Sequence, residues 1–249
     1  MSILLIRANR NEVDQAALAS HGVESIVDPY LSISKVNNPG GIARLREALI
    51  APGSKWLVVT STNALSFFQA ELIPGELEQI IQTAPDLNFA AIGAQTEKLL
   101  NDLGAHNVLR ASEADSDSLA SVIAKTEPCP VIIPSSSIAM KSLSRTLITH
   151  GFELVEEVIY ATEAVTRFPT SVKQIANGQI SGVLLRSPSA ARAFVDFNGV
   201  VDLPVFCAGR TTAAQAGVLG LSVSAVSVDP SPETVALTIS EYLKAHAHD

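Results

Sequence analysis

Cysteine is scarce in this chain: Cys129 and Cys207 are the only two in 249 residues, and they lie far apart. Neither has a second Cys or a His at metal-ligand spacing, which argues against a disulfide scaffold and a zinc knuckle. Positive charge is also in deficit, since 17 Lys and Arg face 25 Asp and Glu for a formal net charge of −8. A basic nucleic-acid binder must neutralise phosphates, so this balance argues against that class.

Long hydrophobic runs are missing as well. The first apolar run, 3–6, ends at Arg7 and is too short for a signal peptide, and no basic segment leads it. The longest uncharged stretch, 211–228, is broken by Gln, Gly, Ser and Thr and would make a poor membrane span. Hydrophobic residues nevertheless make up 47% of the chain, enough to form cores. These features predict a cytoplasmic protein that does not enter a membrane.

Several nucleotide-binding and hydrolase motifs are absent. The sequence has no P-loop, no G-x-G-x-x-G after an apolar run and no G-x-S-x-G elbow. Two of the five histidines, His21 and His150, come directly before Gly22 and Gly151. A cation at that position complements the end of a helix, so neither histidine stands out as a general base.

What the chain does have is a regular alternation of short apolar runs and segments of helical period. The apolar runs are 3–6, 56–59, 89–92, 131–133, 182–185 and 205–208. Helices are expected over 11–21, 63–72 and 96–103, and around Leu143 and Leu147. Runs without polar alternation are typical of strands buried on both faces, which indicates parallel sheets covered by helices.

The chain also repeats itself. Residues 3–30 resemble 131–160, and residues 56–123 resemble 182–239, so the order of the pieces is a, b, a′, b′. This order predicts two similar α/β domains, but it does not say which a belongs with which b. Two segments are candidate connections: 32–41, with the turn signal Asn37–Gly41, and 162–171.

Six strand-to-helix corners carry the polar chemistry: 7–10, 60–63, 93–96, 134–137, 186–189 and 209–212. Ligands bind beyond the carboxyl ends of parallel strands, where free helix N–H groups and hydroxyls suit carboxylates or phosphates. At any single corner these residues could simply cap helices, but six similar corners favour an anion-lined cleft. The candidate binding residues are Thr60, Ser61, Asn63, Thr96, Ser135, Arg186, Ser187, Ser189, Arg210, Thr211 and Thr212. Tyr160, which ends the run 158–160, could pack locally or donate a proton to a leaving group.

The combined pattern resembles the uroporphyrinogen-III synthase family over almost the whole chain. The segments that carry the resemblance are 59–64, 91–93 with Thr96 and Gly104, 132–134, Leu147 with Gly151, 158–162, 187–190 and 208–214. The resemblance implies two flavodoxin-like α/β domains joined by a two-stranded connection. The first domain would comprise 1–32 and 163–249, and the second 33–162, which pairs a with b′ and b with a′.

The resemblance also implies a reaction: hydroxymethylbilane, a linear tetrapyrrole with eight carboxylates, is cyclised with inversion of its last ring and loss of water. Neither a cofactor nor a metal is expected. Tyr160 matches the tyrosine that the family offers to the leaving group, and Thr60, Ser61, Thr96, Ser187 and Thr211 match its hydroxyls. A cytoplasmic monomer is expected, with a transient contact to the enzyme that precedes it in haem biosynthesis.

Three corners depart from the family pattern. Arg7-Ala8-Asn9 stands where Thr-Arg-Pro is common, Ser135 where a basic residue is common, and Arg186 where the second Thr-Ser pair has Thr. These departures leave two other hypotheses open. One is a non-catalytic module of the same fold that binds tetrapyrroles or other anions, and the other is an enzyme acting on a phosphorylated sugar.

Overall fold

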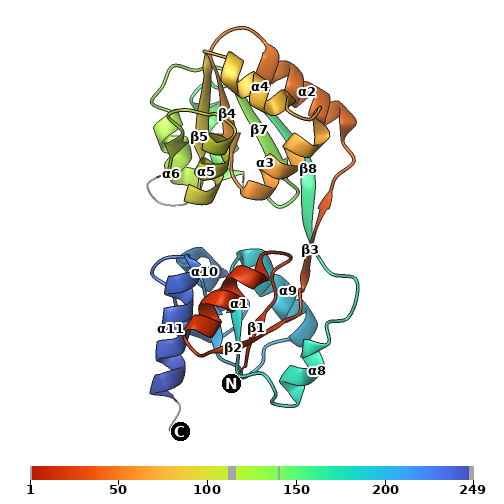
Figure 1. Ribbon diagram of the computed structural model, residues 1–249, viewed down its shortest axis with the longest axis vertical. Helices are drawn as coiled ribbons and strands as arrows, with labels where there is room; N and C mark the ends of the chain where they lie inside the picture. The colour runs from red at the N-terminus through yellow and green to blue at the C-terminus, as the bar shows by residue number, and fades with distance from the viewer. Residues whose placement is uncertain (1, 112–115, 140, 247–249) are drawn as a thin grey trace. The chain divides into compact units, whose positions relative to one another are not determined.

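The computed structural model describes residues 2–111, 116–139 and 141–246 and is an α/β structure (Figure 1). The chain divides into two compact units. Unit 1 combines the residues up to Ile33 with those from Thr162 onward, and unit 2 is the continuous stretch Ser34–Ala161. Each unit has its own sheet, so each is described by itself.

Unit 1 is built on five described strands in the order β11-β10-β9-β1-β2, and the pairings are parallel. The strands are β1 (Ser2–Leu5), β2 (Glu24–Val27), β9 (Gly182–Leu185), β10 (Val205–Cys207) and β11 (Val223–Val226). The helices are α1 (Asn11–Ser20), α8 (Ser171–Ala176), α9 (Pro188–Asn198), α10 (Arg210–Val218) and α11 (Pro232–Ala245). The sheet thus joins the two ends of the sequence.

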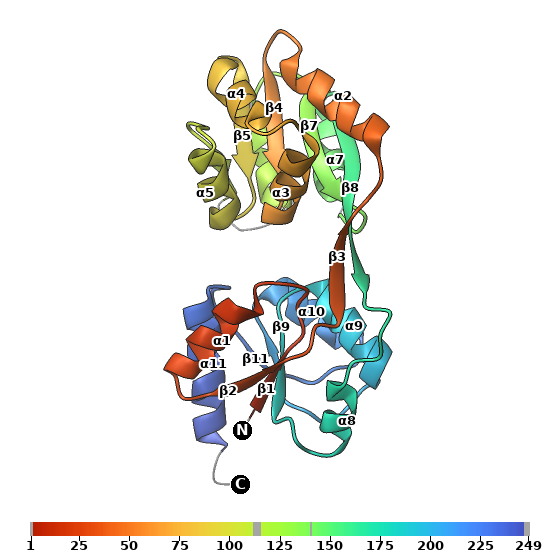
Figure 2. The same ribbon diagram turned by 45° about the vertical axis from the view of Figure 1, so that its right-hand side comes forward.

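Helices cover both faces of the unit 1 sheet, as Figure 2 shows. Leu4 of β1 shares a core with Phe194 of α9 on one face. Its neighbour Ile3 shares a second core with Leu18 of α1 and Ile239 of α11 on the other. All five side chains are at most 1% exposed. Because successive residues of a strand point to opposite faces, burial on both explains why these strands read as unbroken apolar runs.

Unit 2 is built on six described strands in the order β3-β8-β7-β4-β5-β6. The strands are β3 (Leu31–Lys35), β4 (Lys55–Val59), β5 (Leu87–Ala91), β6 (Leu109–Arg110), β7 (Val131–Ser136) and β8 (Leu154–Ala164). The helices are α2 (Pro39–Ile50), α3 (Thr62–Glu71), α4 (Glu76–Thr83), α5 (Ala94–Asp102), α6 (Ser116–Ile123) and α7 (Ser142–Thr149). Val58 packs with Leu119 of α6 and Leu147 of α7, whereas the adjacent Leu57 and Val59, also fully buried, point to the opposite face.

Strands β3 and β8 carry the chain between the units. The Val36 N–H donates to the Ile159 carbonyl, and the Val165 N–H donates to the Tyr30 carbonyl, both at 2.9 Å. Residue numbers rise along one strand as they fall along the other, so this pair is antiparallel, unlike the rest of the two sheets. The two α/β units are therefore joined by a two-stranded connection.

The internal repeat of the sequence appears as a repeated strand order. Unit 1 reads β2-β1-β9-β10-β11, and unit 2 reads β8-β7-β4-β5-β6 once β3 is set aside. With β7 equivalent to β1 and β4 to β9, both follow the flavodoxin-like order 2-1-3-4-5. The order reverses between β1 and β9 in unit 1, and between β7 and β4 in unit 2. Such switch points are where ligands bind in sheets of this kind.

Local structure follows the sequence signals with one correction. His21 and His150 are the C-cap residues of α1 and α7, and Gly22 and Gly151 follow with φ of 73° and 86°, as predicted. The turn expected over 37–41 is instead the start of α2. Asn38 caps that helix by accepting the Gly41 N–H at 2.9 Å, and Pro39 takes the first helical position, where a missing N–H costs nothing.

Candidate functional site

The candidate catalytic tyrosine, Tyr160 of β8, extends its hydroxyl to the corner after β4, beside the switch point of unit 2. The Tyr160 hydroxyl lies 2.8 Å from the Ser61 hydroxyl, and either group can be the donor. The Tyr160 ring stacks on Phe67 of α3 with centroids 5.5 Å apart, and the residue is 6% exposed. Strand β8 therefore supplies the phenol, and the start of α3 supplies its hydrogen-bond partner and its packing surface.

Ser61 has a second function at this corner. Its hydroxyl accepts the Ala64 N–H at 3.1 Å and so caps α3. With one lone pair committed to that N–H, the hydroxyl still has a proton to donate to the Tyr160 oxygen. Thr60 and Asn63 flank Ser61 and are partly exposed. The corner thus presents hydroxyls, an amide and the start of a helix within a few residues, and the Tyr160 phenol reaches it from β8.

Two other predicted residues of unit 2 are buried. Thr96 is 4% exposed in the first turn of α5. Ser135 is 1% exposed, and its hydroxyl donates to the Glu156 carboxylate at 3.1 Å. That carboxylate also accepts from Lys141 at 3.0 Å and from Ser144 at 2.6 Å. The structure therefore brings Ser135 together with α7, while Tyr160 lies with α3.

Burial disfavours the charged form of Glu156, but its three donors outweigh that effect. Its pKa is raised by desolvation, then lowered by the hydrogen bonds from Ser144 and Lys141, and the net change is downward. Glu156 stays ionised at neutral pH, so the Ser135 hydroxyl is held by an anion of the protein itself.

In unit 1 the corner after β9 resembles the Ser61 corner, because a serine hydroxyl caps the helix that follows. The Ser187 hydroxyl caps α9 by accepting the Ala190 N–H at 3.2 Å, and it lies 2.9 Å from the Ser189 hydroxyl. After β10, Arg210 and Thr211 are exposed in the first turn of α10, whereas Thr212 is 5% exposed. The residue that precedes α10 is Gly209, and no side-chain cap is found there among the described residues. The first N–H groups of α10 therefore remain available to an anion.

Arg186 is the most buried of the predicted cations, with a side chain 14% exposed. It lies beside Asp14, with Nη1 3.2 Å from Oδ1, and its Nη2 donates to the Pro230 carbonyl. Asp14 also accepts from Arg7 Nη1 at 3.3 Å. Sequence reasoning placed Arg7 at a polar corner but gave no sign of Asp14, which lies within the first turns of α1.

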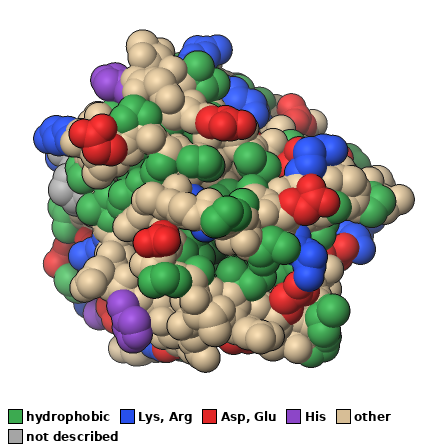
Figure 3. Space-filling view, turned by 90° about the horizontal axis from the view of Figure 1, so that it is seen from above, with side chains coloured by type: hydrophobic (Ala, Val, Ile, Leu, Met, Phe, Trp, Pro, Cys, Tyr) green, Lys and Arg blue, Asp and Glu red, His purple; other side chains and the backbone are tan. Residues whose placement is uncertain are grey.

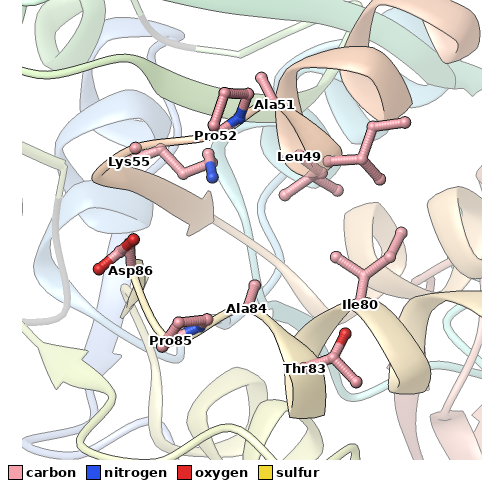
Figure 4. A pocket seen from close by; sticks show the side chains of 11 residues that line it. Leu49, Ala51, Pro52, Lys55, Ile80, Thr83, Ala84, Pro85 and Asp86 are labelled. Atoms are coloured by element: carbon pink, nitrogen blue, oxygen red, sulfur yellow. The ribbon is translucent and has the colours of Figure 1, made fainter.

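A surface pocket lies at the opposite end of the unit 2 sheet, where the strands begin. In Figure 4, Lys55 and Asp86 lie on one side of it and Leu49 and Ile80 on the other. None of the predicted site residues lines this pocket. We therefore place the candidate site not at this pocket but at the carboxyl ends of the strands.

Figure 3 shows a face of the molecule with apolar side chains toward the middle and cations beside carboxylates around the edge.

Within the described residues, no helix is both long and apolar enough to cross a bilayer. The same residues contain no group of three His, Cys, Asp or Glu side chains placed to hold a metal ion. Both cysteines are free. Burial raises the pKa of the Cys207 thiol to about 11, which keeps it protonated at neutral pH and makes it a poor nucleophile.

The fold and the site define a class of two-domain α/β proteins. Its features are two α/β units of flavodoxin-like strand order, an antiparallel strand pair that joins them, and strand ends rich in hydrogen-bond donors. The sequence profile of one family, described as Uroporphyrinogen-III synthase HemD, matches residues 12–236. The chain belongs to the uroporphyrinogen-III synthase family. A search of curated protein sequences finds no significant match.

Solved structures show the same fold. A mutant uroporphyrinogen III synthase from the extremely thermophilic bacterium Thermus thermophilus matches with a TM-score of 0.67 and 14% identity, over 99% of this chain and 100% of that one. The uroporphyrinogen-III synthetase of Helicobacter pylori 26695 matches with a TM-score of 0.59 and 15% identity, over 97% and 99% of the two chains. At this level of identity the likeness establishes the fold.

Proposed function

We propose that this chain is a uroporphyrinogen-III synthase, a cyclising lyase of haem biosynthesis that acts on hydroxymethylbilane. The observation that carries the proposal is the Tyr160–Ser61 pair at the unit 2 switch point, in a chain of this family. In the reaction, the C–O bond of the hydroxymethyl group breaks and a C–C bond closes the macrocycle. The hydroxide leaves with one proton as water, and the last pyrrole ring is inverted.

The phenol of Tyr160 suits the leaving hydroxide. Loss of hydroxide is driven by the electron-rich pyrrole, so the protein needs to supply a hydrogen bond or proton to the departing oxygen. Tyr160 can donate that proton, while the Ser61 hydroxyl donates to the phenol oxygen and stabilises the charge that develops there. The Phe67 ring holds the phenol in place, which fits catalysis by positioning.

The other predicted residues serve the carboxylates of the substrate in this proposal. Three of the corner helices begin with free N–H groups or with hydroxyls, at Ser61, Ser187 and Gly209. Helix starts favour anions, and Arg210 adds an exposed cation beside one of them. This arrangement supports binding of a polycarboxylate by a protein whose net charge is −8.

The deciding experiment supplies fresh hydroxymethylbilane to the purified protein and separates the oxidised products into isomers I and III. Spontaneous closure gives isomer I because the last ring is not inverted. We expect an excess of isomer III over the no-protein control. Isomer I alone, from folded protein, would overturn the proposal.

A second candidate function is a non-catalytic module that binds tetrapyrroles. The observation that favours it is Ser135, which replaces the basic residue common in the family and donates its hydroxyl to Glu156. Binding of uroporphyrin without formation of isomer III would support this candidate.

We further propose that the protein works in the cytoplasm as a monomer, without a cofactor or metal, and contacts the preceding pathway enzyme transiently. Water loss from an electron-rich pyrrole requires no redox partner, which supports the absence of a cofactor. Isomer III formation is expected to be unchanged after dialysis against EDTA. Loss of activity that zinc or magnesium restores would contradict this expectation.

A further inference from the structure

Three arginines lie at the switch point of unit 1, and two of them contact one buried carboxylate. Arg7 follows β1, Arg10 directly precedes α1, and Arg186 follows β9. The Asp14 side chain is 1% exposed and faces two of them, with Oδ2 3.3 Å from Arg7 and Oδ1 3.2 Å from Arg186. The three cations thus come from the ends of the two strands between which the strand order reverses, and from the start of the helix that follows β1.

The hydrogen bonding of this cluster is incomplete. Asp14 Oδ1 and Arg186 Nη1 are both buried, yet neither has a hydrogen-bond partner in the described residues, because their 3.2 Å contact is not aligned as one. Asn11, which is 6% exposed, also has a buried and unpartnered Oδ1. A buried ion pair stabilises a fold only when its remaining polar atoms are satisfied. The cluster is therefore poorly explained as a device for stability.

Arg186 is under repulsion from the other two arginines. Burial lowers the pKa of Arg186, Asp14 opposes that effect, and Arg7 and Arg10 lower the pKa further by repulsion. Asp229 is the other carboxylate that attracts Arg186, and it is itself held by the Ser231 N–H at 2.7 Å at the start of α11. An anion added beside the three arginines would relieve their mutual repulsion.

We propose that Arg7, Arg10 and Arg186 bind carboxylates of the tetrapyrrole, and that Asp14 is a positioning residue that holds Arg7 and Arg186 for this purpose. The inference rests on the proposed function, because it assigns a subsite to that substrate. Guanidinium groups match carboxylates in a two-pronged geometry, provided that the groups are held in place. Asp14 provides this support from within α1.

The experiment measures binding of two fluorescent porphyrins: uroporphyrin III, with eight carboxylates, and coproporphyrin III, with four. We expect Arg186→Gln to raise the Kd for uroporphyrin about tenfold and to affect coproporphyrin less, a change that corresponds to one carboxylate contact. Arg7→Gln and Arg10→Gln are expected to act in the same direction. Arg192→Gln is the matched control, since Arg192 is exposed, lies on α9 of the same unit and bonds to Gln215.

Asp14→Asn separates positioning from charge. Removal of a negative charge beside Arg7 and Arg186 would tighten anion binding if charge alone mattered. Positioning predicts the opposite: a Kd several-fold higher, with Asp14→Glu restoring part of the affinity. With hydroxymethylbilane, Asp14→Asn is expected to raise KM while kcat changes little. Unchanged or tighter binding by Asp14→Asn would overturn the positioning role of Asp14.

Two outcomes distinguish this inference from the proposed function. If the wild-type protein forms isomer III but the three arginine variants bind uroporphyrin and hydroxymethylbilane normally, the arginine site is wrong and the synthase stands. If no isomer III forms but the arginine variants weaken uroporphyrin binding, the site stands and the activity is wrong. Circular dichroism checks that each variant folds, and Arg10→Gln, which leaves the Asp14 ion pairs in place, tests the site if Asp14→Asn does not fold.

Discussion

Tyr160 combines two features at one residue, a buried ring and a hydroxyl with a single identified partner. The ring is fixed by Phe67, and the hydroxyl by Ser61. These two features can be separated experimentally, because Phe in place of Tyr keeps the ring and its packing and removes only the hydroxyl.

Tyr160→Phe is expected to slow isomer III formation about a hundredfold, the lower end of what a positioned proton donor contributes. The free energy of unfolding is expected to fall by only about 1 kcal/mol, since one hydrogen bond is lost and the ring stacking remains. The coupled isomer assay and urea unfolding measure the two effects. An unchanged rate would remove Tyr160 from the chemistry.

Asp28 gives a second prediction for a single residue, and it concerns pH. Its carboxylate is 6% exposed and accepts from Arg167 at 2.5 Å, and from the Ser171 N–H and hydroxyl at 2.9 and 2.8 Å. Burial raises the pKa of Asp28, but these donors outweigh burial and lower it below its ordinary value of 3.8. Its stabilising effect is therefore full at neutral pH and is lost as the pH falls through the lowered pKa.

Asp28→Asn is expected to cost about 2 kcal/mol of unfolding free energy at pH 7, since charge-assisted hydrogen bonds are lost. The difference from the wild-type protein should shrink as the pH falls below the ordinary pKa of 3.8. Urea unfolding across that range measures it. Asp102→Asn is the control, because Asp102 makes an exposed pair with Lys98 and its loss should cost about 0.5 kcal/mol or less. A difference that does not depend on pH would contradict the assignment.

At the residue scale, the sequence predicts contacts between residues close in the chain and misses contacts between residues far apart in it. Ser61 and Ser187 stand directly before helices, where serine is a favoured cap, so both could be found from the sequence. The pair of Asp14 and Arg186 could not, because these residues are 172 positions apart in the chain and become neighbours only when β1 pairs with β9. The sequence also shows no reason why Ser135 should donate to Glu156.

At the scale of elements, the two repeated strand-to-helix corners are a natural matched pair. Helices α3 and α9 begin with serine caps of nearly the same backbone geometry, with φ and ψ of −154° and 157° at Ser61 and −156° and 158° at Ser187. The two caps differ in their second partner, which is Tyr160 for Ser61 and Ser189 for Ser187.

Ser187→Ala is expected to lower the free energy of unfolding by about 1 kcal/mol, because α9 loses its cap. Ser61→Ala is expected to cost about 1 kcal/mol more, since the buried Tyr160 hydroxyl also loses its partner. Urea unfolding measures both serine variants. Ser61→Ala, Tyr160→Phe and the variant that combines them complete a double-mutant cycle for the Ser61–Tyr160 pair. Equal losses for the two serine variants would mean that the phenol finds another partner.

Strands and helices were predictable where a hydrophobic pattern was strong. The apolar runs at 56–59, 131–133 and 182–185 became β4, β7 and β9. The start of α2 was missed because Asn and Pro favour turns and also begin helices, and only the pattern that follows decides between them.

For the whole molecule, the strand order answers a question that the repeat left open. The sequence order a, b, a′, b′ allowed two pairings, and the sheets unite the first strands with β9–β11 and β4–β6 with β7 and β8. Nothing in the local pattern carries this information, because parallel strands of similar composition can pair in either way. Family resemblance pointed to this pairing where periodicity could not.

One consequence of this pairing is testable with a fragment. Residues 31–164 include every described strand of the six-stranded sheet and the cores on its faces. We expect this fragment to unfold cooperatively and to give no excess of isomer III, because the arginine cluster and three of the corners are missing. Thermal unfolding followed by circular dichroism and the isomer assay measure these properties. A gradual, non-cooperative melt would show that unit 2 depends on the rest of the chain.

The pairing of β1 with β9 also delays completion of the unit 1 sheet during synthesis on the ribosome. Leu5 aligns with Leu184, so the first strand emerges long before its central partner. At translation rates of about 5–20 residues per second, β1 waits roughly 10–35 s while all of unit 2 is made. Unit 2 can close its own sheet in that interval, whereas the buried residues of β1 have no central strand to pair with. The apolar residues of β1 thus need protection from aggregation throughout this interval, although in the finished protein β1 lies inside the sheet, between β2 and β9.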